Sequence, residues 1–476
     1  MRRLSPPTNP MVGTVFPVLV FFLAAIYSGI LEKMPFLGPF HLLMLLGGLA
    51  LIVIGLSGRL PVVLNNPMAK YLALFTVWFI ICVPFGSWIG GSVQLFIDFW
   101  SKSALAFVLV AGCVQTIDQC KTIFKTIGYS VGILAMMALA LGGVDNTGRL
   151  GLLDTRYDNA NDFAWTLVLG LSFLLFLLFN GNRWQKIIAG LFCAPILLAL
   201  VKTGSRGGML GFCLLAFFGL FQVSRATRIK LALAIPVLMV VLFIVTPPEI
   251  RGRYTTIFGS GKDYTGINMK ALSSEERLQS TASASAEARW GLLKDSIRMT
   301  LTHPVFGVGP GNFQVAQAEI ALSRGEARGA WRVTHNTYTQ LSSEMGIPGL
   351  VIYLMFLYQL LKALNRIARS KYTGKDWQDL RALAKALRAT FLTLIFVMFF
   401  GSFAYDTNIP ILAGLACALS LMAQRQSALL KVPAQVSPAL QVPAEPVIEP
   451  AWMSFQLPVG RDAPKLSSHV VLPPLG

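Results

Sequence analysis

The 476 residues are 54% hydrophobic and only 13% charged, with a mean hydropathy of +0.62. This composition excludes an ordinary soluble globular protein and indicates a polytopic membrane protein. The formal net charge of +18 does not indicate a nucleic-acid partner, because the basic residues do not gather in one soluble segment with interleaved aromatic residues.

Apolar runs along the chain predict an all-α fold with about twelve transmembrane helices. A hydrocarbon core about 30 Å thick needs roughly 17 to 25 residues, and a helix satisfies its own backbone hydrogen bonds there. The predicted spans centre on 13–30, 41–57, 70–87, 103–117, 126–143, 161–180, 186–201, 207–223, 230–247, 339–361, 389–405 and 408–424.

Lysine and arginine in the short connections predict the orientation, because basic residues accumulate on the cytoplasmic side. Every second connection is basic, starting from a cytoplasmic N-terminus, so both chain ends are expected in the cytoplasm. The basic residues are Arg59, Lys70, Lys121, Lys125, Arg183, Lys186, Arg225, Arg228 and Lys230, followed by those of the segment 362–388.

Four segments follow from this layout. Residues 1–247 hold nine transmembrane helices, and residues 248–336 form a helical periplasmic cap between the ninth and the tenth. Residues 337–424 hold the last three helices. Residues 425–476 are rich in Pro, Ala, Val and Ser, which predicts a disordered cytoplasmic tail.

Within the cap, "SAEARWGLLKDSIRMTLTHP" (285–304) predicts an amphipathic helix that Pro304 ends. We expect its apolar face, including a buried Trp290, to rest on the bundle or the lipid interface. The following "VFGVGPGNF" predicts a glycine-rich turn rather than a phosphate-binding loop, which would need a preceding strand. The apolar face comprises Trp290, Leu293, Ile297 and Leu301.

Arg206 lies in the tight turn "KTGSRGG" (202–208), on the side where basic residues are normally depleted. A charge at the membrane edge is a candidate functional group that needs an anionic partner. Gly207 and Gly208 would let a bulky ligand approach the backbone. The alternative is an interfacial anchor whose guanidinium reaches the headgroups.

Three further arginines are candidates of the same type. Arg289 lies on the cap helix and either binds a ligand or forms a structural salt bridge with Glu287 or another acid. Arg149 and Arg156 lie in the external loop "VDNTGRLGLLDTRYDNAND" (144–162), between the fifth and sixth predicted spans.

His335 follows the arginine-rich cap and begins a predicted span, so we expect it to face the same external cavity as Arg206. Histidine can accept a proton from a hydroxyl and release it again near neutral pH. The alternative is an interfacial polar residue. No HExxH, P-loop, acidic pair or cluster of metal-ligand spacing accompanies it, so the sequence predicts neither a metal nor a cofactor.

At these residues the chain resembles the bacterial O-antigen ligase and O-antigen polymerase-like family, integral-membrane glycosyltransferases of the inner membrane. The resemblance covers roughly residues 140–365 in motif and most of the chain in topology. It is carried by "YDNANDFAWTL", "KTGSRGGMLGF", "ARWGLLKDSIRMTLTHPVFGVGPGNF" and "THNTYTQLSSEMGIPGLVIYL".

The resemblance implies roles for individual residues. Arg206 and Arg289 match the arginines expected to hold the diphosphate of an undecaprenyl-diphosphate-linked glycan. His335 matches the histidine expected to activate the acceptor hydroxyl, in an inverting, metal-independent transfer at the periplasmic face. The expected supporting residues at the substrate are Arg149, Arg156, Asn161, Asn336 and Glu344, the last as a group that orients the histidine.

The acceptor stays open at this point. Lipid A core is favoured, and the alternatives within the family are a polymerase that extends a lipid-linked glycan and a transferase that modifies protein hydroxyls. Membrane lipids are expected partners in every case. The alternative from another class is a secondary transporter or a flippase for lipid-linked glycans, since about twelve spans suit those folds too.

Overall fold

The structure is a computed structural model that describes residues 9–34, 42–144, 148–255, 274–325 and 332–431. Residues 1–427 form one compact unit, and of a second unit, 428–476, only the end of the last helix is described. The described part is helical apart from one two-stranded antiparallel sheet, which confirms the predicted all-α fold.

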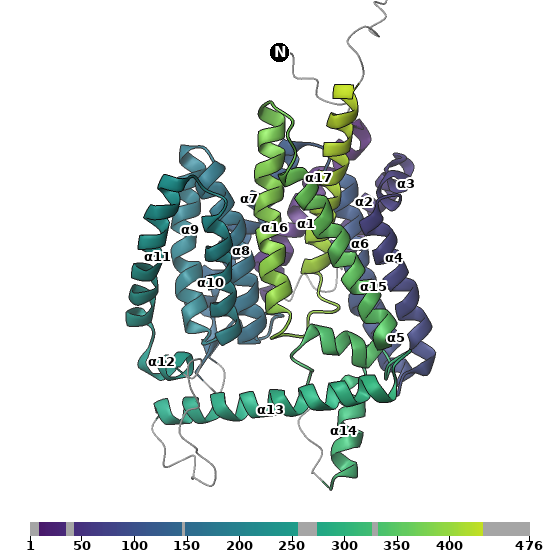
Figure 1. The fold of residues 1–476 in the computed structure, drawn as a ribbon, viewed down its shortest axis with the longest axis vertical. Coiled ribbons are helices and arrows are strands. Elements are labelled where there is room, and N and C mark those ends of the chain that lie inside the picture. Colours follow the sequence, from purple (N-terminus) through teal and green to yellow (C-terminus); the bar gives the residue numbers. More distant parts are fainter. Residues whose placement is uncertain (1–8, 35–41, 145–147, 256–273, 326–331, 432–476) are drawn as a thin grey trace, which may run out of the picture. The chain divides into compact units, whose positions relative to one another are not determined.

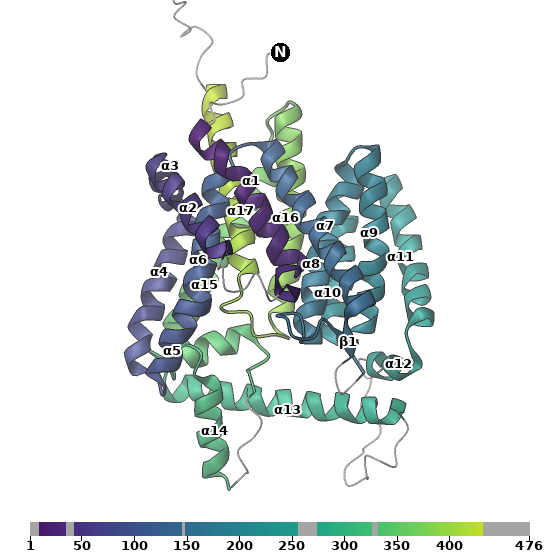
Figure 2. The ribbon, with the colours of Figure 1, turned by 180° about the vertical axis from the view of Figure 1, so that it is seen from behind.

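The bundle helices run up and down between two ends, with the start of α1 at one end and a crossing helix, α13, at the other (Figures 1 and 2). The helices before the cap are α1 (Pro10–Ser28), α2 (Leu42–Leu56), α3 (Arg59–Leu64), α4 (Pro67–Cys82), α5 (Ile89–Leu95), α6 (Ser101–Cys113), α7 (Ile117–Leu141), α8 (Ala160–Asn180), α9 (Arg183–Lys202), α10 (Arg206–Leu220) and α11 (Arg225–Val245). Those of the cap and the last part are α12 (Pro248–Thr255), α13 (Ser274–Thr302), α14 (Phe313–Ser323), α15 (Thr337–Ala368), α16 (Lys375–Val397) and α17 (Asn408–Lys431). Short turns η1 (Leu31–Lys33), η3 (Val83–Phe85) and η4 (Phe96–Trp100) and strands β1 (Gly143–Val144) and β2 (Leu150–Gly151) complete the described elements.

In the described part, eight helices are long and apolar enough to cross a membrane, and α2 and α10 are shorter apolar helices. The predicted count of about twelve is therefore not confirmed. The span predicted at 389–405 belongs to α16, which begins earlier, at Lys375. The reason is an apolar stripe of Trp377, Leu380, Leu383 and Leu387 that buries one face of a segment whose other face is charged. Likewise α17 continues to Lys431, so the predicted tail begins later than residue 425, and its remainder lies outside the described residues.

Local sequence explains where several bundle helices begin. Asn66 caps α4 by accepting a hydrogen bond from the amide of Met68, and Pro67 occupies the first helical position. Asn182 and Gln185 form a reciprocal capping box at the start of α9. Each cap satisfies backbone amides that a helix start leaves without partners.

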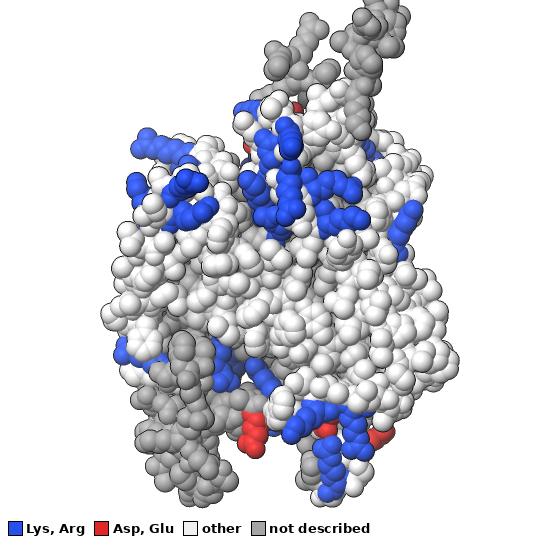
Figure 3. Space-filling view, viewed as in Figure 1, with Lys and Arg blue, Asp and Glu red and all other residues white. Residues whose placement is uncertain are grey.

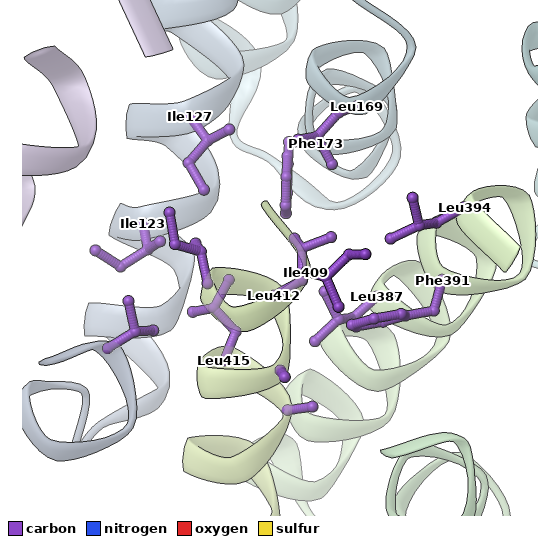
Figure 4. Packing of buried hydrophobic residues seen from close by; sticks show 14 of the residues in the cluster. Ile123, Ile127, Leu169, Phe173, Leu387, Phe391, Leu394, Ile409, Leu412 and Leu415 are labelled. Atoms are coloured by element: carbon purple, nitrogen blue, oxygen red, sulfur yellow. The ribbon is translucent and has the colours of Figure 1, made fainter. Parts of the chain in front are cut away.

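The core of the bundle surrounds the first part of α17. In Figure 4, Ile409 and Leu412 of α17 lie between α7, α8 and α16, next to buried residues such as Phe173 and Phe391. A side chain at Gly414 would come within 2.8 Å of Val110 on α6, so this glycine permits close helix packing. The large contiguous core fixes the bundle on which the functional residues are placed.

The cap consists of α12, α13 and α14. Helix α13 crosses the end of the bundle and contacts α15, where Thr300 and Ser342 share a hydrogen bond of 2.8 Å. Arg324 pairs with the buried Asp295 at 2.7 Å. A small second core joins α13 and α14 and comprises Leu292, Met299, Val308, Phe313 and Ala316.

The prediction of a buried Trp290 was wrong. Trp290 is 59% exposed, and Ile297 and Leu301 of the same stripe are also exposed. The buried face of α13 instead carries Leu292 and Met299, because α14 and α15 pack against that side. The predicted end of the helix before Pro304 is correct.

Helix α15 is broken at Gly346, whose φ of 70° and ψ of −178° are not helical. The amide of the next residue, Ile347, donates to the carbonyl of Pro304 at 2.8 Å. A β-carbon at Gly346 would lie 2.0 Å from the carbonyl oxygen of Val305. The break therefore lets the glycine-rich turn after α13 dock into α15, and it separates the polar first turns of α15 from its long apolar part.

Candidate functional site

The turn between α9 and α10 forms the first part of the site. Gly204 has a φ of 57°, which a residue with a side chain rarely adopts. Ser205 caps α10, and its hydroxyl accepts from the amide of Gly208 at 3.2 Å. Arg206 is therefore fixed at the first position of α10, at the α13 end of the bundle.

Asn161, in the first turn of α8, ties this turn to the external loop. Its side-chain oxygen accepts from Arg149 at 2.7 Å and from the hydroxyl of Ser205 at 3.0 Å. Arg149 also donates to the carbonyl of Thr203 at 2.8 Å. The structure thus brings three predicted residues, Arg149, Asn161 and Arg206, to one place. Asn161 and Thr203 supply neutral acceptors for Arg149, and the charge of Arg149 also acts on Asp162 in the first turn of α8.

Arg289 adds a third guanidinium from α13. Its pKa is lowered to about 10, first by burial and then by the positive charges of Arg206 and Arg149. Its Nε is buried and has no hydrogen-bond partner among the described residues. Glu287 and the other described acids form no ion pair with it, so the predicted structural salt bridge of Arg289 is absent from this part of the chain. A buried, repelling cluster with an unused donor is suited to an anion with several oxygens.

His335 lies just before α15 in a strained turn. Its φ is 53°, uncommon for a residue other than glycine. Its amide donates to the hydroxyl of Ser402 at 2.9 Å, and that hydroxyl also shares a hydrogen bond with Thr334 at 2.9 Å. Asn336 caps α15 by accepting from the amides of Tyr338 and Thr339. These bonds fix the backbone from which the imidazole extends into the site.

The pKa of His335 is lowered to about 4 by burial, then by the positive charges of Arg289 and Arg332. The imidazole is therefore neutral near pH 7 and able to accept a proton. An anion bound to Arg289 would offset that positive charge and raise the proton affinity of His335. The arginine cluster and the histidine are thus coupled electrostatically.

A cavity of about 210 Å³ lies between Arg289 of α13 and His335 before α15. Arg289 and His335 both line it, with Trp290 and Leu293 from α13 and Phe400 from the segment after α16. The list is completed by Thr334, Asn336 and Phe399. Arg206 is not among the lining residues, but its neighbour Gly207 packs on the cavity wall: a β-carbon there would lie 3.3 Å from Phe400. The site is therefore polar on one wall and aromatic on the other.

Arg149 and Asn161 do not line this cavity, and two further predicted residues outside its lining make contacts elsewhere. Arg156 forms an ion pair with Glu32 of η1, and its amide donates to the same carboxylate at 2.8 Å. The carboxylate of Glu344 accepts from the hydroxyl of Tyr405 at 2.7 Å and from the amide of Gly311 at 2.9 Å. The hydrogen bonds of Glu344 therefore hold the glycine-rich turn in place, rather than orienting His335.

The sequence did not point to the aromatic wall. Phe399 and Phe400 follow α16 inside a long apolar run, where nothing distinguishes a cavity residue from a lipid-facing one. Ser402, which holds the His335 turn, lies 67 residues further along the chain. Among the described residues no group of three or more His, Cys, Asp or Glu side chains could hold a metal ion.

Comparison with known proteins gives one family. The family model described as O-antigen ligase matches residues 191–354, a range that contains Arg206, Arg289 and His335. This is the family that the sequence motifs resemble, so that expectation is confirmed. The match supports an O-antigen ligase or polymerase type of function on lipid-linked glycans, in a multi-pass membrane protein. No curated protein matches the chain.

Proposed function

We propose that the chain is an O-antigen ligase-type glycosyltransferase, which moves a glycan from an undecaprenyl-diphosphate carrier to an acceptor hydroxyl at the periplasmic face of the bacterial inner membrane. The observation that carries the proposal is that Arg289 and a neutral His335 line one cavity, while Arg289 also lies close enough to Arg206 and Arg149 for their charges to lower its pKa. A guanidinium cluster is chemically matched to a diphosphate, because each planar fork can bind two oxygens.

In this reaction the acceptor oxygen forms a bond to the anomeric carbon, and the bond from that carbon to the diphosphate oxygen breaks. The diphosphate leaves with the electron pair. Arg289 and Arg206 would stabilise the negative charge that grows on it, as preorganised donors do in other transferases. His335 would take the proton of the acceptor hydroxyl. Attack opposite the leaving group inverts the anomeric carbon, and no metal is needed for this charge balance.

The proposed orientation of the protein in the membrane rests on the distribution of basic residues. Lysine and arginine gather over α16 and the nearby helix ends at the end opposite α13, which fits a cytoplasmic face (Figure 3). The cavity with Arg289 lies at the α13 end. On this orientation the site meets periplasmic acceptors, of which lipid A core is the favoured one.

The test is a transfer assay with purified protein, undecaprenyl-diphosphate glycan and, side by side, lipid A core, a second lipid-linked glycan and a protein acceptor. We expect transfer to lipid A core that survives EDTA, and its loss in Arg289→Ala and His335→Ala. Arg298→Ala on the same helix and His303→Ala are matched controls, since both side chains are exposed.

Equal activity in the site variants and the controls would remove the site assignment, and transfer only to a lipid-linked glycan would reassign the protein as a polymerase. Movement of the donor across vesicles without transfer would favour a flippase.

A further inference from the structure

A second cavity, of about 450 Å³, lies at the opposite end of the bundle. Its walls come from α8, α10, the connection between α10 and α11, the first turn of α11, and α16. Gly219, which lines it, and Arg206 stand 13 residues apart on α10, which corresponds to about 20 Å along the helix. The cavity is therefore separate from the candidate active site and does not depend on the proposed transfer.

Small residues create this space. Ala382, Ala386 and Ala389 follow one face of α16 at positions i, i+4 and i+7, and all three line the cavity. Across it, a β-carbon built on Gly219 would meet nothing within 4 Å. Larger side chains at these positions would fill the space, so the cavity follows directly from the sequence of the two helices.

The cavity is polar at its outer end and apolar further in. Along α16 the lining residues change from Gln378 and Lys385 to Ala389 over about 17 Å. Along α8 they change from Asn180, the last residue of that helix, to Phe176 and Leu175, and the hydroxyl of Ser172 further in donates to the carbonyl of Leu169 of its own helix. Both walls therefore have the same polarity gradient, which matches a molecule with a polar head and an apolar tail.

The outer end is also cationic. Arg381 and Lys385 line it, and no aspartate or glutamate does. Arg381 is held in position because its Nη1 donates to the carbonyl of Tyr372 at 2.5 Å. The nearby Asp379 does not compensate this charge, since it pairs with Lys121 at 2.7 Å. Neither Arg381 nor Lys385 takes part in any ion pair found within the described ranges. Figure 3 shows the basic side chains gathered at this end of the molecule.

We propose that this cavity binds one anionic glycerophospholipid of the surrounding leaflet. The phosphate lies against Arg381 and Lys385, the hydroxyls of Ser224 and Thr227 and the amide of Gln222 bind the headgroup, and the acyl chains begin along the apolar walls. A basic pocket between membrane helices is the usual setting for such lipids, and the volume lies within the range of ligand pockets. The change from polar to apolar lining favours a lipid over a free phosphate, because a phosphate makes no favourable contact with the apolar walls.

Native mass spectrometry of the full chain, released from nanodiscs of phosphatidylglycerol mixed with phosphatidylcholine, tests the proposal. We expect one phosphatidylglycerol retained per protein, and about tenfold weaker retention in the double variant Arg381→Gln and Lys385→Gln. The matched control is Arg183→Gln with Lys186→Gln, two cations at the start of α9 that do not line the cavity, and it should retain lipid like the unmodified protein.

A second variant, Ala386→Leu, reduces the volume without changing the charge and should also weaken retention. Inorganic phosphate at millimolar concentration should not displace the lipid. Equal retention of phosphatidylcholine and phosphatidylglycerol, displacement by phosphate alone, or unchanged retention in the double variant would each overturn the proposal. Thermal unfolding without added lipid shows whether the variants are folded.

Discussion

Replacement of Arg289 by alanine tests the central argument most directly, because this residue links the arginine cluster to the histidine. Its pKa of about 10 means that the protonated guanidinium is less stable in this site than in water by about 3 kcal/mol. Burial is the larger cause of that cost and the repulsion from Arg206 and Arg149 is the smaller one, and a bound diphosphate would offset both by placing negative charge against the guanidinium. The binding energy released there is available to stabilise the leaving group.

From this we expect Arg289→Ala to lower kcat by roughly 10²- to 10³-fold, the usual effect of removing one preorganised donor. Arg289→Lys should be intermediate, because a lysine keeps the charge but cannot bind two oxygens in a fork. The assay is initial-rate transfer of the glycan, with Arg298→Ala as the control on the exposed side of the same helix.

The same substitution should change His335. Removal of the positive charge of Arg289 favours the protonated imidazole, so the pKa of His335 should rise from about 4 towards its ordinary value of 6.5. The rate of carbethoxylation of His335 against pH, followed by mass spectrometry, measures this directly. A pKa of His335 that stays near 4 in Arg289→Ala, with transfer as fast as in Arg298→Ala, would refute the coupling of the two groups.

Three further outcomes are expected. Between about pH 4 and 6.5 the unfolded chain binds a proton at His335 and the folded chain does not, so the contribution of this residue to stability falls as pH falls through that window, measurable as a decrease in Tm. The kcat/KM for transfer, which reports the free enzyme, should likewise persist to mildly acidic pH and be lost as pH approaches 4. Gly346→Ala puts a β-carbon against the carbonyl of Val305 in a backbone conformation that alanine rarely adopts, and should cost several kcal/mol, seen as a loss of monodisperse protein in size-exclusion chromatography. Arg156→Ala should leave transfer near its normal rate and cost at most about 1 kcal/mol, because this arginine pairs with Glu32 at a half-exposed position; a large loss of transfer would return it to the substrate site.

The sequence predicted the fold class and the order of the elements well, because apolar runs and helix caps are local signals. It wrongly predicted that Trp290 of α13 is buried, since a stripe such as Trp290 and Leu301 shows that a helix is amphipathic but not whether protein or lipid covers it. The predicted start of the helix at residue 389 was also too late, since α16 begins at Lys375. Charged residues on one face of that segment lower its mean hydropathy, although the other face is a buried apolar stripe.

The site was predictable to the extent that its residues are unusual at their positions. Arg206, Arg289 and His335 stand out as polar groups at membrane boundaries; Arg289 and His335 line one cavity, and the residue after Arg206, Gly207, packs against Phe400 of its wall. The sequence could not separate Arg149 from Arg156. One bonds to Asn161 and the other to Glu32, 124 positions away in the chain, and such long-range pairing leaves no local pattern.

The hydrogen bonds that hold Arg149 in the cluster go to neutral groups. Arg149 is held by the amide oxygen of Asn161 and the carbonyl of Thr203, which fix its geometry without cancelling its charge. Carboxylates in these positions would stabilise the fold more, but they would compete with a diphosphate and raise the pKa of Arg289. The repulsion between the arginines destabilises the fold, and the Ser205 cap of α10 and the packed core of the bundle offset this cost. A site built in this way is least stable when empty and gains most from a ligand with at least two negative charges, which a lipid diphosphate supplies and a neutral acceptor does not.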